Sequence, residues 1–212
     1  MSNISFLPHF AAFSRVRAVT FALTMLISTV AYAQVLESFW SIVGFDKATQ
    51  DYVLMHRRLE RQIGPIALST SVDEINRKIQ QLATAIRVER PDAKQGDLFT
   101  PPLSRLLRAR IHQALTDHRY SVDDARVSSR VDGVDYTQVN LRVNGTFPWA
   151  LGATMLPCLI EVLPPLPPEL QYRMVDDLLV LIDVHASLIV DILPYALADL
   201  TVRNLMPQGG LQ

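Results

Sequence analysis

Apolar residues recur at three- and four-residue intervals through the N-terminal half of the chain, which is the spacing of amphipathic helices. Residues 46–63 predict one helix, ended by the Gly64-Pro65 pair. The stretch STSVDEINRKIQQLATAIRVERP predicts a second, because Ser71 and Glu74 form a capping box before a narrow apolar seam. The seam consists of Val72, Ile75, Ile79, Leu82 and Ile86. Because a short connection joins them, the two helices should pair as an antiparallel hairpin.

A third helix should follow the polar stretch RPDAKQGDLFTPP, with Thr100 as its cap and Pro101 in its first turn. Its wide apolar face consists of Leu103, Leu106, Leu107, Ile111, Ala114 and Leu115. Basic residues surround the rest of the helix, namely Arg105, Arg108, Arg110, His112 and Arg119. These charges either contact an acidic partner or lipid headgroups, or simply keep that side of the helix solvated.

Farther along the chain the period changes from that of a helix to that of a strand. In YTQVNLRVNG, every second residue is polar, which predicts a half-buried strand that ends at Asn144-Gly145. Three more strands are expected at 169–175, 178–184 and 188–193, with Asp176-Asp177 as a two-residue turn. Strand 178–184 is apolar at nearly every position, so it should lie in the centre of a meander, covered on both faces.

Helices first and strands later predict an α+β protein rather than alternating α/β units. The expected organisation is a signal peptide at 1–33, a helical region at 34–120 and an α+β region at 121–212. The helical region holds the hairpin and the third helix. The last region ends in the small antiparallel meander of three strands (169–193).

The N-terminus has the pattern of a secretory signal. Arg15 and Arg17 precede an apolar run that ends in Ala31-Tyr32-Ala33, with small residues at the two positions that a signal peptidase reads. We therefore expect cleavage between Ala33 and Gln34 and export to the periplasm. The alternative is a retained membrane anchor, since the apolar run can be extended to the roughly 18–20 residues of a membrane span.

Composition narrows the class of protein. The chain is 49% apolar and 19% charged, which is typical of a globular protein. Its net charge is −1, and it becomes −3 without residues 1–33, which contain two arginines and no acidic residue. Such a balance disfavours nucleic-acid binding. With Cys158 as the single cysteine, an internal disulfide is excluded, and a small buried side chain is expected rather than a reactive thiol.

One candidate site lies in LVLIDVHASLIVDIL, where Asp183, His185 and Asp191 interrupt an aliphatic stretch. If 185–187 form a three-residue loop, the three side chains share a face and could hold a divalent ion. If the loop is only Ala186-Ser187, the register shifts and Asp191 turns to the other face. A purely structural alternative has Asp183 and His185 capping the strand end, while Asp191 faces solvent.

The segment LPPLPPELQYRMVDDLLVLIDVHASLIVDIL (163–193) resembles the C-terminal module of RcnB-like periplasmic nickel/cobalt-homeostasis proteins. The shared features are a proline-rich lead-in, a Tyr-Arg strand, an acidic turn, an aliphatic strand and a final strand that contains Ile-x-Asp. The resemblance implies an exported location and a β-module. A histidine-rich tract is missing from this chain. The whole chain also resembles secreted proteobacterial proteins.

Two functions are compatible with these patterns. A glycine-rich phosphate loop, Gly-x-Ser-x-Gly, His-Glu-x-x-His and paired-cysteine zinc motifs are all missing, so no catalytic residue or cofactor is assigned. The favoured function is an exported, non-enzymatic envelope protein with a protein-interaction or structural role, whose partner is another envelope protein. Membrane contact is expected only if the signal is uncleaved. The alternative is a periplasmic divalent-metal-binding or metal-homeostasis protein that uses Asp183, His185 and Asp191.

Overall fold

The computed structural model describes the backbone of residues 12–64, 71–151 and 155–198, and side chains from residue 34 onward except Thr137. The chain divides into two compact units, Met1–Trp40 and Ser41–Gln212, and the sheet, the core and the candidate site belong to the second. The elements are α1 (Ala12–Ile63), α2 (Val72–Glu89), α3 (Pro101–Asp117), α4 (Val122–Ser128), α5 (Pro157–Val162), β1 (Leu170–Val175), β2 (Leu178–Asp183) and β3 (Leu188–Leu193).

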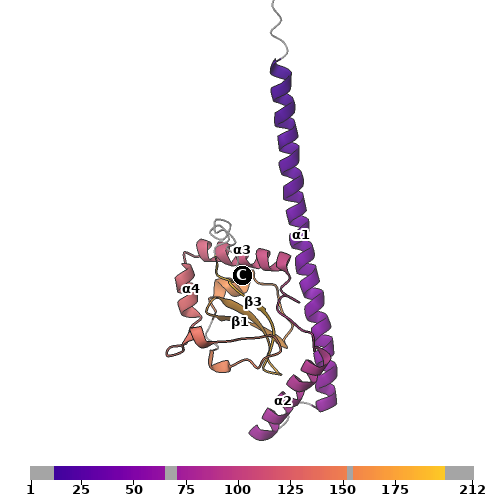
Figure 1. The fold of residues 1–212 in the computed structure, drawn as a ribbon, viewed down its shortest axis with the longest axis vertical. Coiled ribbons are helices and arrows are strands. Elements are labelled where there is room, and N and C mark those ends of the chain that lie inside the picture. Colours follow the sequence, from indigo (N-terminus) through magenta and orange to yellow (C-terminus); the bar gives the residue numbers. More distant parts are fainter. Residues whose placement is uncertain (1–11, 65–70, 152–154, 199–212) are drawn as a thin grey trace, which may run out of the picture. The chain divides into compact units, whose positions relative to one another are not determined.

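The sheet is an antiparallel meander with the strand order β1-β2-β3 (Figure 1). Val175 pairs with Leu178 across the turn Asp176-Asp177. There Asp176 has a left-handed φ of +56°, as tight hairpin turns require. The middle strand is buried at every position after Leu178. The α+β class and the central position of this strand are thus confirmed, and the helices α1 to α5 precede the meander.

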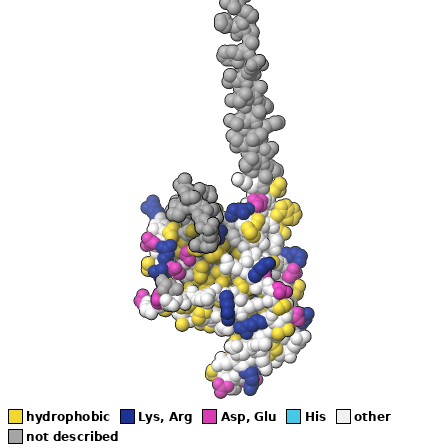
Figure 2. All heavy atoms as spheres, viewed as in Figure 1, with side chains coloured by type: hydrophobic (Ala, Val, Ile, Leu, Met, Phe, Trp, Pro, Cys, Tyr) yellow, Lys and Arg dark blue, Asp and Glu magenta, His cyan; other side chains and the backbone are white. Residues whose placement is uncertain are grey.

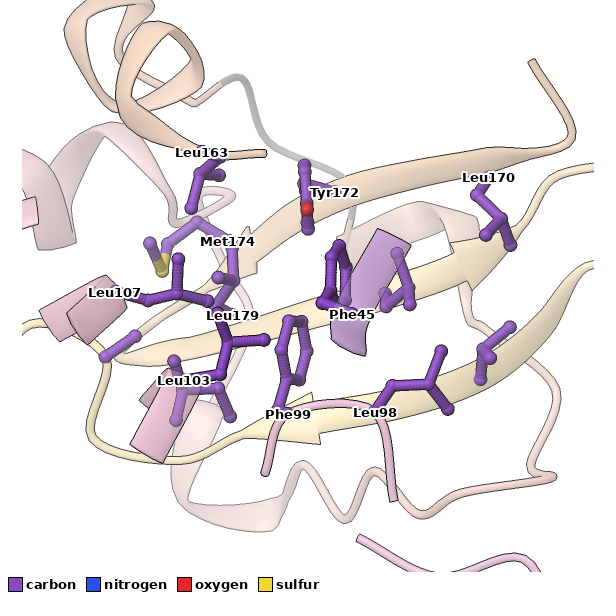
Figure 3. Packing of buried hydrophobic residues seen from close by; sticks show 14 of the residues in the cluster. Phe45, Leu98, Phe99, Leu103, Leu107, Leu163, Leu170, Tyr172, Met174 and Leu179 are labelled. Carbon is purple, nitrogen blue, oxygen red and sulfur yellow. The ribbon is translucent and has the colours of Figure 1, made fainter. Parts of the chain in front are cut away.

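The main hydrophobic core lies on the face of the sheet that carries Leu179 and Leu181. Figure 3 shows residues of this core, where side chains from α1, α3 and the loop before α3 meet those of the sheet. The ring of Phe99 stacks on Phe45 and on Tyr172, with centroid distances of 5.9 and 6.5 Å. The predicted apolar face of α3 is buried here, apart from the partly exposed Leu106.

The opposite face of the sheet has its own smaller core. Val180, Ile182 and Ile189 pack there against Phe147 and Leu151. The residues of β2 are aliphatic at nearly every position because both faces of this strand are covered and neither contacts water.

The strand predicted over YTQVNLRVNG is wrong. Tyr136–Gln138 is a single 3-10 turn, and the residues after it lack regular structure until Thr146, which forms one bridge with Leu188. Val139 and Leu141 alternate with polar residues because they pack on the smaller core, which requires the same pattern as a half-buried strand. Side-chain packing, and not a ladder of backbone hydrogen bonds, produced the period of two.

The helical half follows the predicted order. The first helix begins well before residue 46, and its capped successor starts after Ser71, which accepts from the backbone N–H of Glu74. Only the second half of the apolar seam of α2 is buried, at Leu82 and Ile86. Val72, in the first turn, is exposed. The side chain of Arg58 in α1 pairs with Glu89 at the end of α2, over 3.0 Å.

The predicted signal segment 1–33 lies outside the residues whose side chains are described, so its cleavage stays a prediction. Within the described part of the chain, no helix combines the length and the apolar composition that crossing a membrane requires. Cys158 is buried on α5, as expected, and burial raises the pKa of its thiol.

Candidate functional site

Asp183, at the end of β2, accepts four hydrogen bonds although its side chain is fully buried. Its Oδ1 accepts from the backbone N–H groups of His185 (3.0 Å) and Ala186 (2.8 Å) in the turn that leads to β3. Its Oδ2 accepts from the hydroxyl of Tyr52 (2.7 Å) and from Nδ1 of His56 (2.6 Å). The carboxylate therefore joins the turn to α1.

His56 reaches this carboxylate because of helical spacing. Tyr52 and His56 are four residues apart on α1, so both project from the same face of the helix toward the sheet. Because an ionised carboxylate can only accept, Nδ1 of His56 donates to Asp183. The other ring nitrogen, Nε2, is fully buried and has no hydrogen-bond partner among the described residues.

That free nitrogen faces two further side chains. Nε2 of His56 lies 3.5 Å from Oε2 of Glu60, which is one helical turn farther along α1. The other carboxylate oxygen, Oε1, lies 3.2 Å from Nδ1 of His185 in the β2–β3 turn. The two imidazole rings have their centroids 5.3 Å apart. His56, Glu60 and His185 are the group of ligand-type residues whose donor atoms all lie within 4.8 Å of one another in the described part of the chain.

These separations bring the three side chains within reach of one ion. A tetrahedral ion bound about 2.0–2.1 Å from each donor holds neighbouring donors roughly 3.3–3.5 Å apart. The contacts from Glu60 to the histidines, 3.5 and 3.2 Å, are close to that length and are made by different oxygens, so the carboxylate lies between the two imidazoles. The side chain of His56 is buried, whereas that of Glu60 is 25% exposed and that of His185 is 44% exposed. An ion held here could be reached from solvent.

Asp183 controls the protonation of His56. Burial lowers the pKa of His56, but the hydrogen bond and negative charge of Asp183, together with the charges of Glu60 and Glu169, outweigh burial, so the pKa is raised from its ordinary value of 6.5. Burial, followed by the charge of Asp183, raises the pKa of Tyr52 well above its usual range. Tyr52 therefore remains a neutral hydrogen-bond donor to Asp183.

A second carboxylate lies near the cluster. Glu169 is buried and pairs with Arg57 of α1, with 2.5 Å between Oε1 and Nε. Burial raises the pKa of Glu169, but the bond from Arg57 overrides this effect and leaves that pKa lowered. The guanidinium of Arg90 lies over the ring of Tyr52, 5.1 Å from its centroid. The cations on two sides balance part of the negative charge that the buried carboxylates bring.

The register of the β2–β3 hairpin differs from both alternatives considered for it. Asp183 pairs with Leu188, so the connection contains the four residues 184–187. A bulge between Leu181 and Ile182 then places Asp191 opposite Leu181. The turn is long because Asp183 closes it by accepting two of its backbone N–H groups.

Asp191 belongs to a separate network, and the expectation that it faces solvent is wrong. It is fully buried and accepts from the backbone N–H groups of Gly96 (2.8 Å), Leu98 (2.7 Å), Phe99 (2.7 Å) and Ile192 (2.7 Å). Burial raises the pKa of Asp191, and these four donors oppose that rise. Asp191 thereby anchors the loop before α3 to the sheet, which explains its place in an aliphatic strand.

Of the three residues predicted as metal ligands, the structure brings only His185 into the cluster with His56 and Glu60. Asp183 stands behind His56 as its hydrogen-bond partner, and Asp191 lies in the other network. Sequence reasoning assigned no role to His56 and Glu60. The available signal was their spacing of four on a helix, but helices often carry such pairs on a solvated face.

The chain matches no protein-family model, no curated protein and no solved structure. The resemblance of residues 163–193 to RcnB-like proteins therefore stays a prediction.

Proposed function

We propose that this protein binds a divalent transition-metal ion through His56, Glu60 and His185. The observation that carries the proposal is the buried Nε2 of His56, which lacks a hydrogen-bond partner and faces a carboxylate and a second imidazole. A buried polar atom without a partner calls for an explanation, and a bound ion supplies one for Nε2. A metal ion would bind Nε2 directly, whereas a proton on Nε2 has the Glu60 carboxylate, 3.5 Å away, as its acceptor.

The donor set favours particular metals. Two imidazoles and one carboxylate suit Zn²⁺, Ni²⁺, Co²⁺ and Cu²⁺, whereas Mg²⁺ and Ca²⁺ prefer oxygen ligands alone. Asp183 supports the site as the outer carboxylate that fixes the tautomer and the orientation of His56, an arrangement common behind metal-bound histidines. In a tetrahedral site, three protein ligands leave one position for water.

The proposed role is that of an exported, non-enzymatic metal-binding protein. It corresponds to the second of the two functions expected from the sequence, with His56 and Glu60 taking the places of Asp183 and Asp191 as ligands. Export is part of the proposal and rests on the signal pattern before Gln34. N-terminal sequencing of the protein from a periplasmic fraction tests it: Gln34 as the first residue supports export, and an intact Met1 contradicts cleavage.

Titration calorimetry tests the metal site. Purified protein, first treated with a chelator, is titrated in turn with Zn²⁺, Ni²⁺, Co²⁺ and Cu²⁺. We expect one ion per chain for at least one of these metals. His56→Ala and His185→Ala should each weaken binding by tenfold or more, about 1.4 kcal/mol. His118→Ala, at the exposed end of α3, is the matched control and should bind normally.

Two results would contradict the proposal. One is the absence of stoichiometric binding by all four metals. The other is binding that His56→Ala and His118→Ala affect equally, because the ion would then be held elsewhere.

The interaction or structural role that the sequence favoured stays a prediction. It relied partly on the arginines of α3, which include Arg108 and Arg110. Arg108 donates to the backbone carbonyls of Pro194 (2.8 Å) and Tyr195 (3.1 Å), and Arg110 donates weakly to that of Val162 (3.5 Å). Basic and acidic side chains are also interspersed on the face drawn in Figure 2. Arg108 and Arg110 therefore take part in contacts within the fold.

A further inference from the structure

We propose that metal binding fastens the end of α1 to the β2–β3 turn, so that the docking of this helix end reports metal occupancy. This inference rests on the proposed function. It concerns two segments, the helix end 57–63 and the turn 184–187, which are far apart in sequence and joined at the site.

The ligands are divided between these two structures. Glu60 and His56 come from α1, whereas His185 is the second residue of the turn. An ion bound by all three is therefore a cross-link between the helix and the hairpin. The three donor atoms meet only when the helix end lies on the turn. Metal consequently binds the docked state in preference to any state in which the two segments separate.

The helix end has few apolar contacts of its own. Among the side chains of α1 that the structure describes, the buried apolar ones are Phe45, Tyr52, Val53 and Leu59. Leu59 is the last of them, and only the partly buried Ile63 follows. The remaining contacts of residues 57–63 include ion pairs with partly exposed members, such as Arg57 with Glu169 and Arg58 with Glu89. The exposed pair of Arg58 with Glu89 contributes little to stability, whereas the pair of Arg57 with Glu169 holds a buried carboxylate. This segment depends on polar contacts more than the helix before it does.

Without an ion, the junction carries unsatisfied atoms. Nε2 of His56 and Oε2 of Glu169 are both buried, and neither has a hydrogen-bond partner among the described residues. Opening the helix end would return these atoms to water, which favours opening. An ion on Nε2 of His56 satisfies this atom, so opening no longer gains the hydration of Nε2. The ion also bonds to Glu60 and His185, and opening must break these bonds. Metal occupancy therefore shifts the equilibrium toward the docked helix end.

Hydrogen–deuterium exchange with mass spectrometry tests this inference, with Zn²⁺ as the probe. At free Zn²⁺ of about ten times the Kd, opening that requires metal release should slow about tenfold. Amide exchange should therefore slow about tenfold in 57–63 and in 184–187. Exchange in α3 should not change by that factor, because α3 contributes no ligand.

His185→Gln separates bridging from simple binding. This variant keeps a polar side chain at an exposed turn position, so folding should be preserved, but it removes the ligand that belongs to the hairpin. Any Zn²⁺ still held by His56 and Glu60 would lie on α1 alone. We expect no slowing of exchange in 184–187 for this variant at any Zn²⁺ concentration. His118→Ala should behave as the unmodified protein.

The two proposals fail in different ways. If calorimetry shows stoichiometric Zn²⁺ binding that depends on His56, but exchange in 57–63 and 184–187 is unchanged, the cross-link is overturned and the metal site stands. If Zn²⁺ does not bind at all, the proposed function fails and the cross-link with it. Slowing that persists in His185→Gln also overturns the cross-link.

Discussion

His56 Nδ1 lies 2.6 Å from Asp183 Oδ2, and both side chains are fully buried although 127 positions separate the residues in the chain. This contact joins α1 to the end of the central strand. It also decides which nitrogen of His56 faces Glu60 and is available to an ion. The pair is therefore both a tertiary anchor and the support of the candidate metal site.

Asp183→Asn should destabilise the protein and weaken metal binding. One carboxylate oxygen accepts from Tyr52 and His56, and the other accepts from two backbone N–H groups. In asparagine an NH₂ group replaces one of these oxygens, so one pair of buried donors loses its acceptor in either orientation of the amide. We expect a loss of about 3 kcal/mol in the free energy of unfolding, measured by urea denaturation. Metal affinity should fall roughly 10–100-fold, because His56 loses its orienting carboxylate.

The matched control is Asp123→Asn. Asp123 pairs with Arg126 on the surface, and its side chain is 84% exposed. An exposed ion pair of this kind contributes about 1 kcal/mol or less. Equal losses of stability for the two variants would contradict the anchoring role of Asp183.

The stability of the metal-free protein should decrease as pH rises above about 6.5, through the titration of His56. The pKa of His56 is raised in the folded protein, so the folded state binds more protons than the unfolded state in that window. The stabilisation is complete below 6.5 and is lost as pH passes the folded pKa. Denaturation at pH 6, 7, 8 and 9 in the presence of a chelator measures the slope. His56→Gln should remove this contribution, and an unchanged slope in that variant would exclude His56 as its source.

Asp191→Asn should destabilise the loop before α3. The carboxylate accepts from three backbone N–H groups of that loop, those of Gly96, Leu98 and Phe99. In asparagine an NH₂ group replaces one of the two accepting oxygens, and this group cannot accept from a backbone N–H. Each buried N–H left without an acceptor costs about 1–3 kcal/mol. We expect faster amide exchange in 96–99 with metal binding retained. Loss of metal binding in a folded Asp191→Asn variant would contradict the division into two networks.

Replacing glycine by alanine should have opposite effects at two positions. Gly96 has a φ of +90°, a conformation that L-residues rarely adopt, so Gly96→Ala should cost about 1–2 kcal/mol. Gly44 lies within α1, and a Cβ there would meet no atom within 4 Å. Gly44→Ala should stabilise the helix by about 0.5–1 kcal/mol. Thermal unfolding of both variants measures the difference, and a stabilising Gly96→Ala would show that the backbone there relaxes easily.

The strand predictions succeeded where local chemistry decides the structure. The limits of the three strands were correct to within one or two residues, because alternation, an acidic two-residue turn and a proline-rich lead-in act over short distances. The same reasoning failed at Val139 and Leu141. Their alternation reflects packing on a sheet face, and the sequence pattern of such a covering segment is identical to that of a strand.

The sequence by itself determined the α+β class, the order of the elements and the central position of β2, since periodicity and turn chemistry are local properties of the chain. Only the tertiary structure decided the candidate site. His185 meets His56 and Glu60 because the packing of α1 on the sheet aligns that helix with the hairpin turn. The bulge in the β2–β3 ladder places Asp191 opposite Leu181, where the loop before α3 supplies backbone N–H groups to its carboxylate. Neither relationship is encoded in residue spacing, because both depend on how distant segments pack against one another.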